Sequence, residues 1–276
     1  MAAATARILV NGRPDDALPV LDRGLAYGDG LFETIRFVDG MAPLWARHME
    51  RLRHSCARLH LPAPAAELLL AEARQVVQGL FQAVVRVTVT RGIGERGYAL
   101  PIITRPHRIV AGFALPELSP DHYVQGVRLR ICDIRLAEQP LLAGMKHLNR
   151  LEQVLARAEW SDPAVADGLL LDASGRIVST TMANLFAVID GTLVTPSLER
   201  CGVAGVARAE ALAVQPAQVR DLVLDDLRLA SELFLSSSVR GILPVQAVAD
   251  TVYVPGPVTR AMQRHWRDLG FPMEQA

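Results

Sequence analysis

A short segment that begins and ends with proline, Pro116-Glu-Leu-Ser-Pro120, divides the sequence into two parts that both carry strand and helix patterns. Exposed segments rich in proline are typical of the boundaries between domains. The chain has 276 residues, which is longer than one average domain. We therefore expect two α/β domains, residues 1–115 and residues 122–276, joined by a linker over residues 116–121.

The first part contains short β-branched runs and two amphipathic segments. Runs such as Ala83-Val-Val-Arg-Val-Thr-Val-Thr90 predict strands, and apolar residues three or four apart predict helices. We expect strands over 8–10, 31–37, 83–90 and 109–115, and helices over 47–60 and 65–80.

The second part repeats this mixture. A strand is expected over 127–134, a hairpin over 168–177, a further strand over 178–189, and a glycine turn that opens a helix over 201–208. Leu148, Leu151 and Leu155 recur at helical spacing, which predicts a helix from about His147 with one apolar stripe.

Lys146 lies at the predicted start of that helix. Amide dipoles at a helix N-terminus oppose a positive charge, so they should lower the pKa of this lysine. An amine with a lowered pKa is a nucleophile near neutral pH, as Schiff-base chemistry requires. Most lysines are solvated surface residues. Spacing alone leaves that alternative open, although Lys146 is one of very few lysines in a chain rich in arginine.

Several segments resemble one enzyme family. Gly144-Met-Lys-His-Leu-Asn-Arg-Leu-Glu-Gln-Val-Leu155 is similar to the lysine segment of the aminodeoxychorismate lyases. These belong to the fold-type IV pyridoxal-phosphate family, with D-amino-acid and branched-chain aminotransferases. The string Asp22-Arg-Gly-Leu-Ala-Tyr-Gly-Asp-Gly-Leu-Phe-Glu-Thr-Ile-Arg36 resembles the family's N-terminal signature, and Asn184-Leu-Phe186 resembles its Asn-x-Phe motif.

The resemblance covers nearly the whole chain, with five blocks in family order. It implies a two-domain α/β (α+β) fold of the fold-type IV class, like D-amino-acid aminotransferase. It also implies that pyridoxal 5'-phosphate binds between the domains and that a homodimer completes each site.

The resemblance assigns the cofactor-binding residues. Lys146 would carry pyridoxal 5'-phosphate covalently, and Arg51 would grip its phosphate, a bidentate role that suits a planar guanidinium. The backbone N–H groups of Val206 and Ala207 would bind the phosphate at a helix start. The remaining phosphate turn would be Ser237 and Ser238.

The substrate contacts are less specific. By the same resemblance Tyr27 would line the active site of a neighbouring subunit, and Thr34 would stand beside the catalytic lysine. Arg91 and Arg96 lie in a flexible loop after a predicted strand, and Arg96 matches an arginine that binds substrate carboxylate in D-amino-acid aminotransferases. Surface charge remains the alternative for both arginines.

One position departs from the family pattern. Five residues before its Asn-x-Phe motif the family usually has a glutamate paired with the pyridine nitrogen, whereas this chain has Ser179. A carboxylate keeps that nitrogen protonated, and a hydroxyl does so less well. An elimination that creates an aromatic ring needs less electron withdrawal than transamination does. Ser179 therefore argues against a transaminase more than against a lyase, unless another residue pairs with the pyridine nitrogen.

Composition excludes several other classes of protein. Lys and Arg total 29, as do Asp and Glu, so no net charge favours nucleic acid or an anionic membrane. We expect no metal site, no signal peptide and no membrane span. Three scattered cysteines, Cys56, Cys132 and Cys201, indicate a reduced, cytoplasmic compartment.

The expected function is thus a pyridoxal-phosphate-dependent lyase that converts 4-amino-4-deoxychorismate to 4-aminobenzoate and pyruvate, a step toward folate. Two alternatives remain. One is a D-amino-acid or branched-chain amino-acid aminotransferase of the same fold. The other is a protein that binds the cofactor without catalysis.

Overall fold

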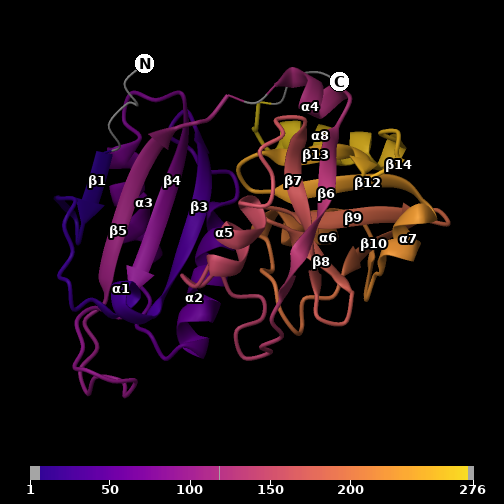
Figure 1. Ribbon diagram of the computed structural model, residues 1–276. Helices are drawn as coiled ribbons and strands as arrows, with labels where there is room; N and C mark the ends of the chain where they lie inside the picture. Colours follow the sequence, from indigo (N-terminus) through magenta and orange to yellow (C-terminus); the bar gives the residue numbers. More distant parts are fainter. Residues whose placement is uncertain (1–6, 118, 273–276) are drawn as a thin grey trace. The chain divides into compact units, whose positions relative to one another are not determined.

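The structure is a computed structural model that describes residues 7–117 and 119–272 (Figure 1). The chain forms two compact units. Unit 1 comprises the residues up to Pro116 together with Met145–Asn149, and unit 2 comprises Glu117–Gly144 and the residues from Arg150 onward. The first boundary lies close to the predicted linker. The short Met145–Asn149 segment differs from expectation, because it belongs to unit 1.

Unit 1 is built on a five-stranded antiparallel sheet with the strand order β2-β1-β5-β4-β3. The strands expected near 8–10, 31–37, 83–90 and 109–115 are confirmed. Their bounds are β1 (Arg7–Val10), β2 (Arg13–Pro14), β3 (Gly30–Val38), β4 (Gln82–Thr90) and β5 (His107–Ala114).

Two of the three helices of unit 1 cover this sheet: α2 (Trp45–Arg58) packs on β3, and α3 (Ala66–Val76) packs on β5. The third, α1 (Arg23–Tyr27), is short and precedes β3. Val85, Val87 and Val89 alternate along β4 and are all fully buried, as expected for side chains on one covered face. Leu52 and Leu69 bring the two longer helices into the same core.

Unit 2 contains a nine-stranded mixed sheet. Eight strands follow the order β11-β10-β9-β12-β13-β6-β7-β8, and β14 pairs with β13. The bounds are β6 (Val127–Leu136), β7 (Val165–Asp172), β8 (Ile177–Thr180), β9 (Asn184–Ile189), β10 (Thr192–Pro196), β11 (Gln218–Arg220), β12 (Ala230–Ser237), β13 (Gly241–Val248) and β14 (Thr251–Val252). The single strand expected over 178–189 is two strands, because a turn separates β8 from β9.

The helices of unit 2 are α4 (Pro120–Val124), α5 (Leu151–Arg157), α6 (Val206–Val214), α7 (Leu224–Arg228) and α8 (Pro257–Asp268). The prediction that a helix starts near His147 is wrong, since α5 begins at Leu151. Backbone groups of Lys146 and Leu148 pair with β3 instead of with a helical turn. The expected apolar stripe is not buried within unit 2 either, because Leu151 and Leu155 are exposed.

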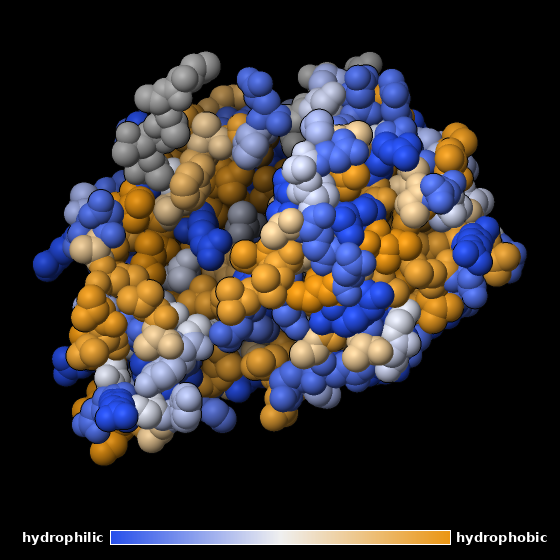
Figure 2. Space-filling view, viewed as in Figure 1, coloured by the Kyte–Doolittle hydropathy of each residue, from blue (hydrophilic) through white to orange (hydrophobic). Residues whose placement is uncertain are grey.

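Apolar side chains also lie on the surface of unit 1. They come from the segment before α1, from α1 itself and from the loop between β4 and β5, where Figure 2 shows orange, apolar atoms at the surface. These exposed residues are Val20, Leu21, Leu25, Ile93, Tyr98, Leu100, Ile102 and Ile103, and we call them the apolar loop surface. No helix in the described ranges is long and apolar enough to cross a bilayer.

Candidate active site

Lys146 is the only lysine in the sequence, and it lies in an extended segment beside β3. Its backbone oxygen accepts a hydrogen bond from the N–H of Phe32 (2.9 Å), and the N–H of Leu148 donates to the oxygen of Gly30 (3.0 Å). Its Nζ lies 4.3 Å from the centroid of the Phe32 ring. Backbone pairing and a cation–π contact therefore fix both ends of this half-buried residue.

The expected effect of helix dipoles on Lys146 is wrong for this backbone. The helix α5 begins at Leu151, and the field of a helix terminus acts only within its first turn.

A glycine before β3 and the glycine that begins it let the lysine segment come close. Gly28 has a φ of 66°, and a Cβ on it would lie 2.2 Å from Asn149 Oδ1. A Cβ on Gly30 would lie 2.5 Å from the backbone oxygen of Val89 and 2.8 Å from Leu148 Cδ1. The close approach that the glycine-rich string predicts is confirmed, and its partner is the lysine segment.

Phe32 and Thr34 share one face of β3, because they are two residues apart in a strand. Arg86 of β4 is the cross-strand partner of Thr34, and its guanidinium carbon lies 4.1 Å from the Phe32 ring centroid. Phe32 thus contacts two cations, Lys146 and Arg86, on the face that carries Thr34. Sequence reasoning does not single out Arg86, since one polar residue in a β-branched strand carries no signal of its own.

Arg51 of α2 is bound to a buried carboxylate. Its Nε donates to Glu33 Oε1 (2.8 Å), and its Nη2 donates to Oε2. His48 Nδ1 lies 2.6 Å from the same Oε2. Burial would raise the pKa of Glu33, but the Arg51 charge and the hydrogen bonds from His48 and Arg51 outweigh it and hold that pKa at about 2. Burial also lowers the pKa of His48, so the cluster consists of a carboxylate, a guanidinium and a neutral imidazole.

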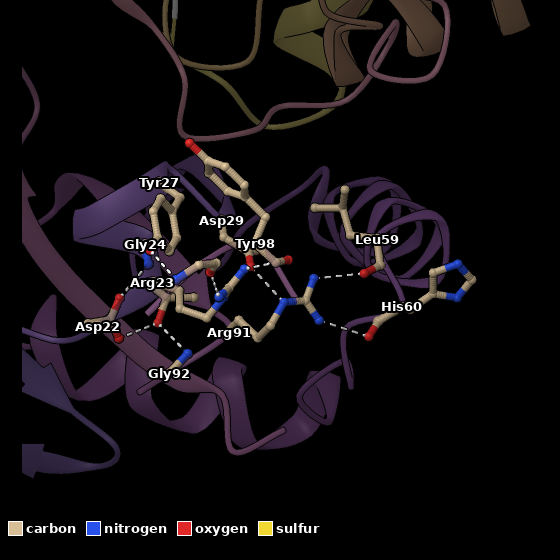
Figure 3. Close-up of polar contacts among 12 residues, drawn as sticks. Asp22, Arg23, Gly24, Tyr27, Asp29, Leu59, His60, Arg91, Gly92 and Tyr98 are labelled. Atoms are coloured by element: carbon tan, nitrogen blue, oxygen red, sulfur yellow. Dashed lines mark hydrogen bonds and ion pairs between the residues drawn. The ribbon is translucent and has the colours of Figure 1, made fainter. Parts of the chain in front are cut away.

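Arg91 is buried, and Figure 3 shows all of its donor groups turned toward protein acceptors. Its Nε donates to Asp29 Oδ2 (2.7 Å), its Nη1 to the backbone oxygen of His60 (3.0 Å), and its Nη2 to that of Leu59 (2.8 Å). These contacts fasten the end of β4 to the end of α2. They favour a structural role for Arg91 over contact with substrate.

The loop after β4 is tied to α1 at the residues that follow Arg96 (Figure 3). Arg23 Nη1 donates to the backbone oxygen of Gly97 (3.0 Å) and its Nη2 to that of Tyr98 (3.4 Å). Tyr27 OH accepts from the N–H of Gly97 (3.2 Å), and the rings of Tyr27 and Tyr98 lie 5.4 Å apart. Arg96 is exposed and makes no hydrogen bond or ion pair with any residue that the structure describes.

In unit 2, Val206 and Ala207 form the first turn of α6 and are buried. The N-cap Gly205 has no side chain that could accept a hydrogen bond from the N–H groups of this first turn. Asn184 fixes the turn before it: its Oδ1 accepts from the N–H of Gly205 (3.0 Å), and its Nδ2 donates to the oxygen of Val203 (3.0 Å). Asn184 of the Asn-x-Phe motif therefore fixes the backbone turn that leads into α6.

Three serines lie at the end of β12: Ser236 and Ser237 are its last two residues, and Ser238 follows. Ser236 Oγ is buried without a hydrogen-bond partner in the described part of the chain. Ser237 Oγ accepts from the N–H of Arg240 (3.0 Å), which closes the turn. Ser237 and Ser238 are half-buried. Their assignment to the phosphate stays a prediction.

Ser179 is buried on β8, and its Oγ donates to the backbone oxygen of Thr180 (2.9 Å). Asp167 is a nearby carboxylate that sequence reasoning does not single out. It accepts hydrogen bonds from Thr180 Oγ1 (2.8 Å) and from the N–H of Thr181 (3.1 Å). Asp167 thus organises the turn after β8. No glutamate stands at position 179.

The described residues contain no group of three or more His, Cys, Asp or Glu side chains arranged to hold a metal ion. Cys56, Cys132 and Cys201 are unpaired and buried. Burial raises the pKa of each thiol to about 11, which leaves them as neutral, unreactive thiols.

Comparison with known proteins places most of the chain in one family. The family model for amino-transferase class IV matches residues 30–248. A curated aminodeoxychorismate lyase from Vibrio harveyi is 37% identical over 92% of this chain and 97% of its own length.

Solved structures agree with this result. The crystal structure of 4-amino-4-deoxychorismate lyase from Pseudomonas aeruginosa has a TM-score of 0.90 and 49% identity, covering 95% of this chain and 98% of that one. A branched-chain amino acid aminotransferase from Escherichia coli has a TM-score of 0.82 and 26% identity, covering 95% and 94%. The arrangement of strands and helices is thus shared with both kinds of enzyme, while sequence identity is greater to the two lyases from Vibrio harveyi and Pseudomonas aeruginosa than to this aminotransferase.

Proposed function

The chain belongs to the aminotransferase class IV family, and from this membership we propose that it is a lyase that converts 4-amino-4-deoxychorismate to 4-aminobenzoate and pyruvate. The observation that carries the proposal is its identity of 37% and 49% to two lyases, against 29% and 26% to two aminotransferases of the same fold. Since the fold is common to both activities, this difference in sequence decides between them.

The residues of each unit fit pyridoxal 5'-phosphate. Lys146 supplies the only side-chain amine of the sequence, and Arg51 is a guanidinium already fixed in a buried ion pair. In unit 2 the N–H groups of Val206 and Ala207 begin an uncapped helix, which suits a phosphate. We assign these four residues to the cofactor, with Ser237 and Ser238 as further phosphate contacts.

When bound, pyridoxal 5'-phosphate draws electrons from the bonds beside the substrate's amine. Lys146 Nζ would hold the cofactor, and as a free amine it would take the proton from the carbon that bears the substrate amine. The same Nζ would supply a proton to the enolpyruvate that leaves. Thr34 shares a strand face with Phe32, over which Lys146 Nζ lies. We assign to Thr34 a hydrogen bond that assists the proton transfer.

Ser179 supports elimination over transamination. Its hydroxyl donates to a backbone oxygen, so it adds no negative charge where the family usually has a carboxylate. Loss of enolpyruvate produces an aromatic ring, and the stability of that ring offsets part of the cost of removing the proton. An aminotransferase has no such gain and depends more strongly on a protonated pyridine nitrogen.

The substrate has two carboxylates, and we assign one of them to Arg96. Arg96 is exposed, and the loop is held by hydrogen bonds at the next two residues, Gly97 and Tyr98. Tyr27 would lie at the active site of a neighbouring copy, and the apolar loop surface supports a homodimer. A cytoplasmic location stays a prediction that rests on the unpaired cysteines.

An assay with two sets of substrates tests the function. The purified protein, loaded with pyridoxal 5'-phosphate, is given 4-amino-4-deoxychorismate, and release of 4-aminobenzoate and pyruvate is measured. In parallel it is given D-alanine or a branched-chain amino acid with 2-oxoglutarate. Faster amino-group transfer than 4-aminobenzoate release would replace the lyase by an aminotransferase. No turnover of either set, with the cofactor bound, would indicate a binding protein.

A further inference from the structure

We propose that Glu33 is a positioning residue that fixes the Arg51 guanidinium for the cofactor phosphate before the cofactor arrives. The inference rests on the proposed function, because it requires that Arg51 binds the phosphate. Glu33 is placed by β3 and Arg51 by α2, and both belong to unit 1.

The contact between the two side chains is two-pronged. Arg51 donates from Nε to one oxygen of Glu33 and from Nη2 to the other. Such a pair fixes both the position and the plane of the guanidinium. The carboxylate itself cannot move, because Glu33 lies in the middle of a strand paired with β4 and only 2% of its side chain is exposed.

His48 supports the same carboxylate from one turn earlier in α2. Residues three apart lie on one helix face, so His48 and Arg51 both reach Glu33. Because the imidazole is neutral, its Nδ1 must carry the proton that is donated to Glu33 Oε2, 2.6 Å away. His48 Nε2 is then an acceptor, and it is buried without a partner among the residues described. His48 thus holds the carboxylate without adding a positive charge.

The charges around this cluster determine how a substitution of Glu33 should alter phosphate binding. Arg51 and Lys146 are the cations that lower the pKa of His48, and Glu33 is the anion that opposes them. Removing the Glu33 charge would leave more positive charge near a phosphate, which by electrostatics alone should strengthen its binding. If Glu33 instead positions Arg51, removing the Glu33 charge should weaken phosphate binding. The two explanations therefore give different results for the same variant.

The test measures cofactor binding and not turnover. Apo-protein is titrated with pyridoxal 5'-phosphate and, separately, with pyridoxal, which lacks the phosphate, and the absorbance of the lysine-bound form gives each dissociation constant. Glu33→Gln should weaken binding of pyridoxal 5'-phosphate about tenfold or more, as expected when a hydrogen-bonded charge is lost. Binding of pyridoxal should change little. Glu33→Asp, which keeps the charge on a shorter side chain, should fall between Glu33→Gln and the parent protein.

Glu72→Gln is the matched control. Glu72 is also a buried carboxylate in unit 1 that binds both Nε and Nη2 of an arginine, Arg108. The Glu72→Gln variant should have a lower melting temperature than the parent but unchanged dissociation constants for pyridoxal 5'-phosphate and for pyridoxal. The inference would be overturned if Glu33→Gln weakened the binding of both ligands equally. It would also be overturned if this variant bound pyridoxal 5'-phosphate as tightly as the parent or more tightly.

Arg51→Lys separates this inference from the proposed function. If that variant binds pyridoxal 5'-phosphate as tightly as the parent, Arg51 is not the phosphate residue and the assignment itself fails. If Arg51→Lys weakens binding but Glu33→Gln does not, the assignment stands and only the positioning role of Glu33 is lost.

Discussion

Lys146 is the only residue whose side chain can form an imine, since the other basic side chains are arginine or histidine. We expect Lys146→Ala to abolish turnover. The loss should exceed the 10²- to 10⁴-fold, roughly, that a missing general base costs, because cofactor attachment is lost as well. Reduction of the holoprotein with borohydride, followed by peptide mass spectrometry, should find the cofactor on the peptide that contains Lys146. Thr34→Val is a control that should slow turnover and keep the attachment. Attachment at another amine would remove Lys146 from its role.

Ser179 tests why this chain should favour elimination. We expect Ser179→Glu to raise the ratio of transamination to elimination, because a carboxylate at this position would favour the protonated pyridine nitrogen. The measurement is the rate of 4-aminobenzoate release and of amino-group transfer by the same preparation. Ser179→Gln has a similar size without the charge, so it should leave the ratio near that of the parent. If Ser179→Glu gives no relative gain in transamination, Ser179 does not set the reaction type.

Buried Glu33 and His48 predict loss of stability in acid. Glu33 has a pKa of about 2 in the fold against 4.5 for the free group, so its contribution is present above pH 4.5 and is lost as the pH falls toward 2. This difference corresponds to at most about 3 kcal/mol. His48 acts in the same direction, because its lowered pKa keeps it neutral in the fold while an unfolded histidine takes up a proton below about pH 6.5.

Urea unfolding of the parent and of Glu33→Gln across this range checks the prediction. The free energy of unfolding of the parent should fall steadily from about pH 6 to pH 3. The curve of Glu33→Gln should start lower at neutral pH and fall less steeply below pH 4.5. Parallel curves would show that Glu33 does not carry the acid sensitivity.

At the scale of elements, the local sequence pattern predicts most strands and helices correctly, but it does not predict the conformation of the lysine segment. Strand β4 and helix α2 have strong alternation or amphipathicity and are buried on the face that the pattern predicts. Residues 146–148 have helical spacing, yet their backbone groups pair with β3, far away in sequence. Only tertiary structure can reveal such pairing. The spacing therefore predicts a helix that begins before Leu151, where α5 starts, and Lys146 lies outside the first turn on which the helix dipole acts.

The candidate site divides in the same way. Motifs identify Lys146, Arg51 and the start of α6, because each has a recognisable sequence context. The residues that bind to them cannot be identified in this way. Glu33 lies within a matched motif, but its ion pair with Arg51 depends on how α2 packs against β3. Arg91 is a different case, since its position at a strand end suits a ligand contact as well as a structural one, and only its buried hydrogen bonds favour the structural role.

The loop after β4 is an element whose order depends on a few side-chain contacts. Tyr27→Phe removes the acceptor for the N–H of Gly97, a bond worth about 1 kcal/mol. We expect trypsin to cleave after Arg96 about fivefold faster in this variant, because the loop opens more often. Tyr253→Phe removes a tyrosine hydroxyl bond in unit 2 and should leave this cleavage unchanged. Equal cleavage of Tyr27→Phe and the parent would mean that Tyr27 does not hold the loop.

At the scale of the whole molecule, the apolar loop surface predicts association with a second copy. Leu25 and Ile103 are each 70% exposed, and clustered exposed apolar side chains on a protein surface mark interaction sites. A single chain has a mass of 30.0 kDa, so light scattering at micromolar concentration should give about twice that value. Ile103→Asp places a charge in the contact and should raise the dimer dissociation constant about tenfold or more.

Val254→Asp is the control, since Val254 is 73% exposed but lies in unit 2, outside the apolar loop surface. It should leave the dimer intact. If each active site needs residues from the neighbouring copy, turnover per chain of Ile103→Asp should fall on dilution in step with the dimer fraction, whereas that of Val254→Asp should not. If Ile103→Asp leaves the dimer dissociation constant unchanged, the interface lies elsewhere. If the Ile103→Asp monomer is fully active, each copy is sufficient by itself.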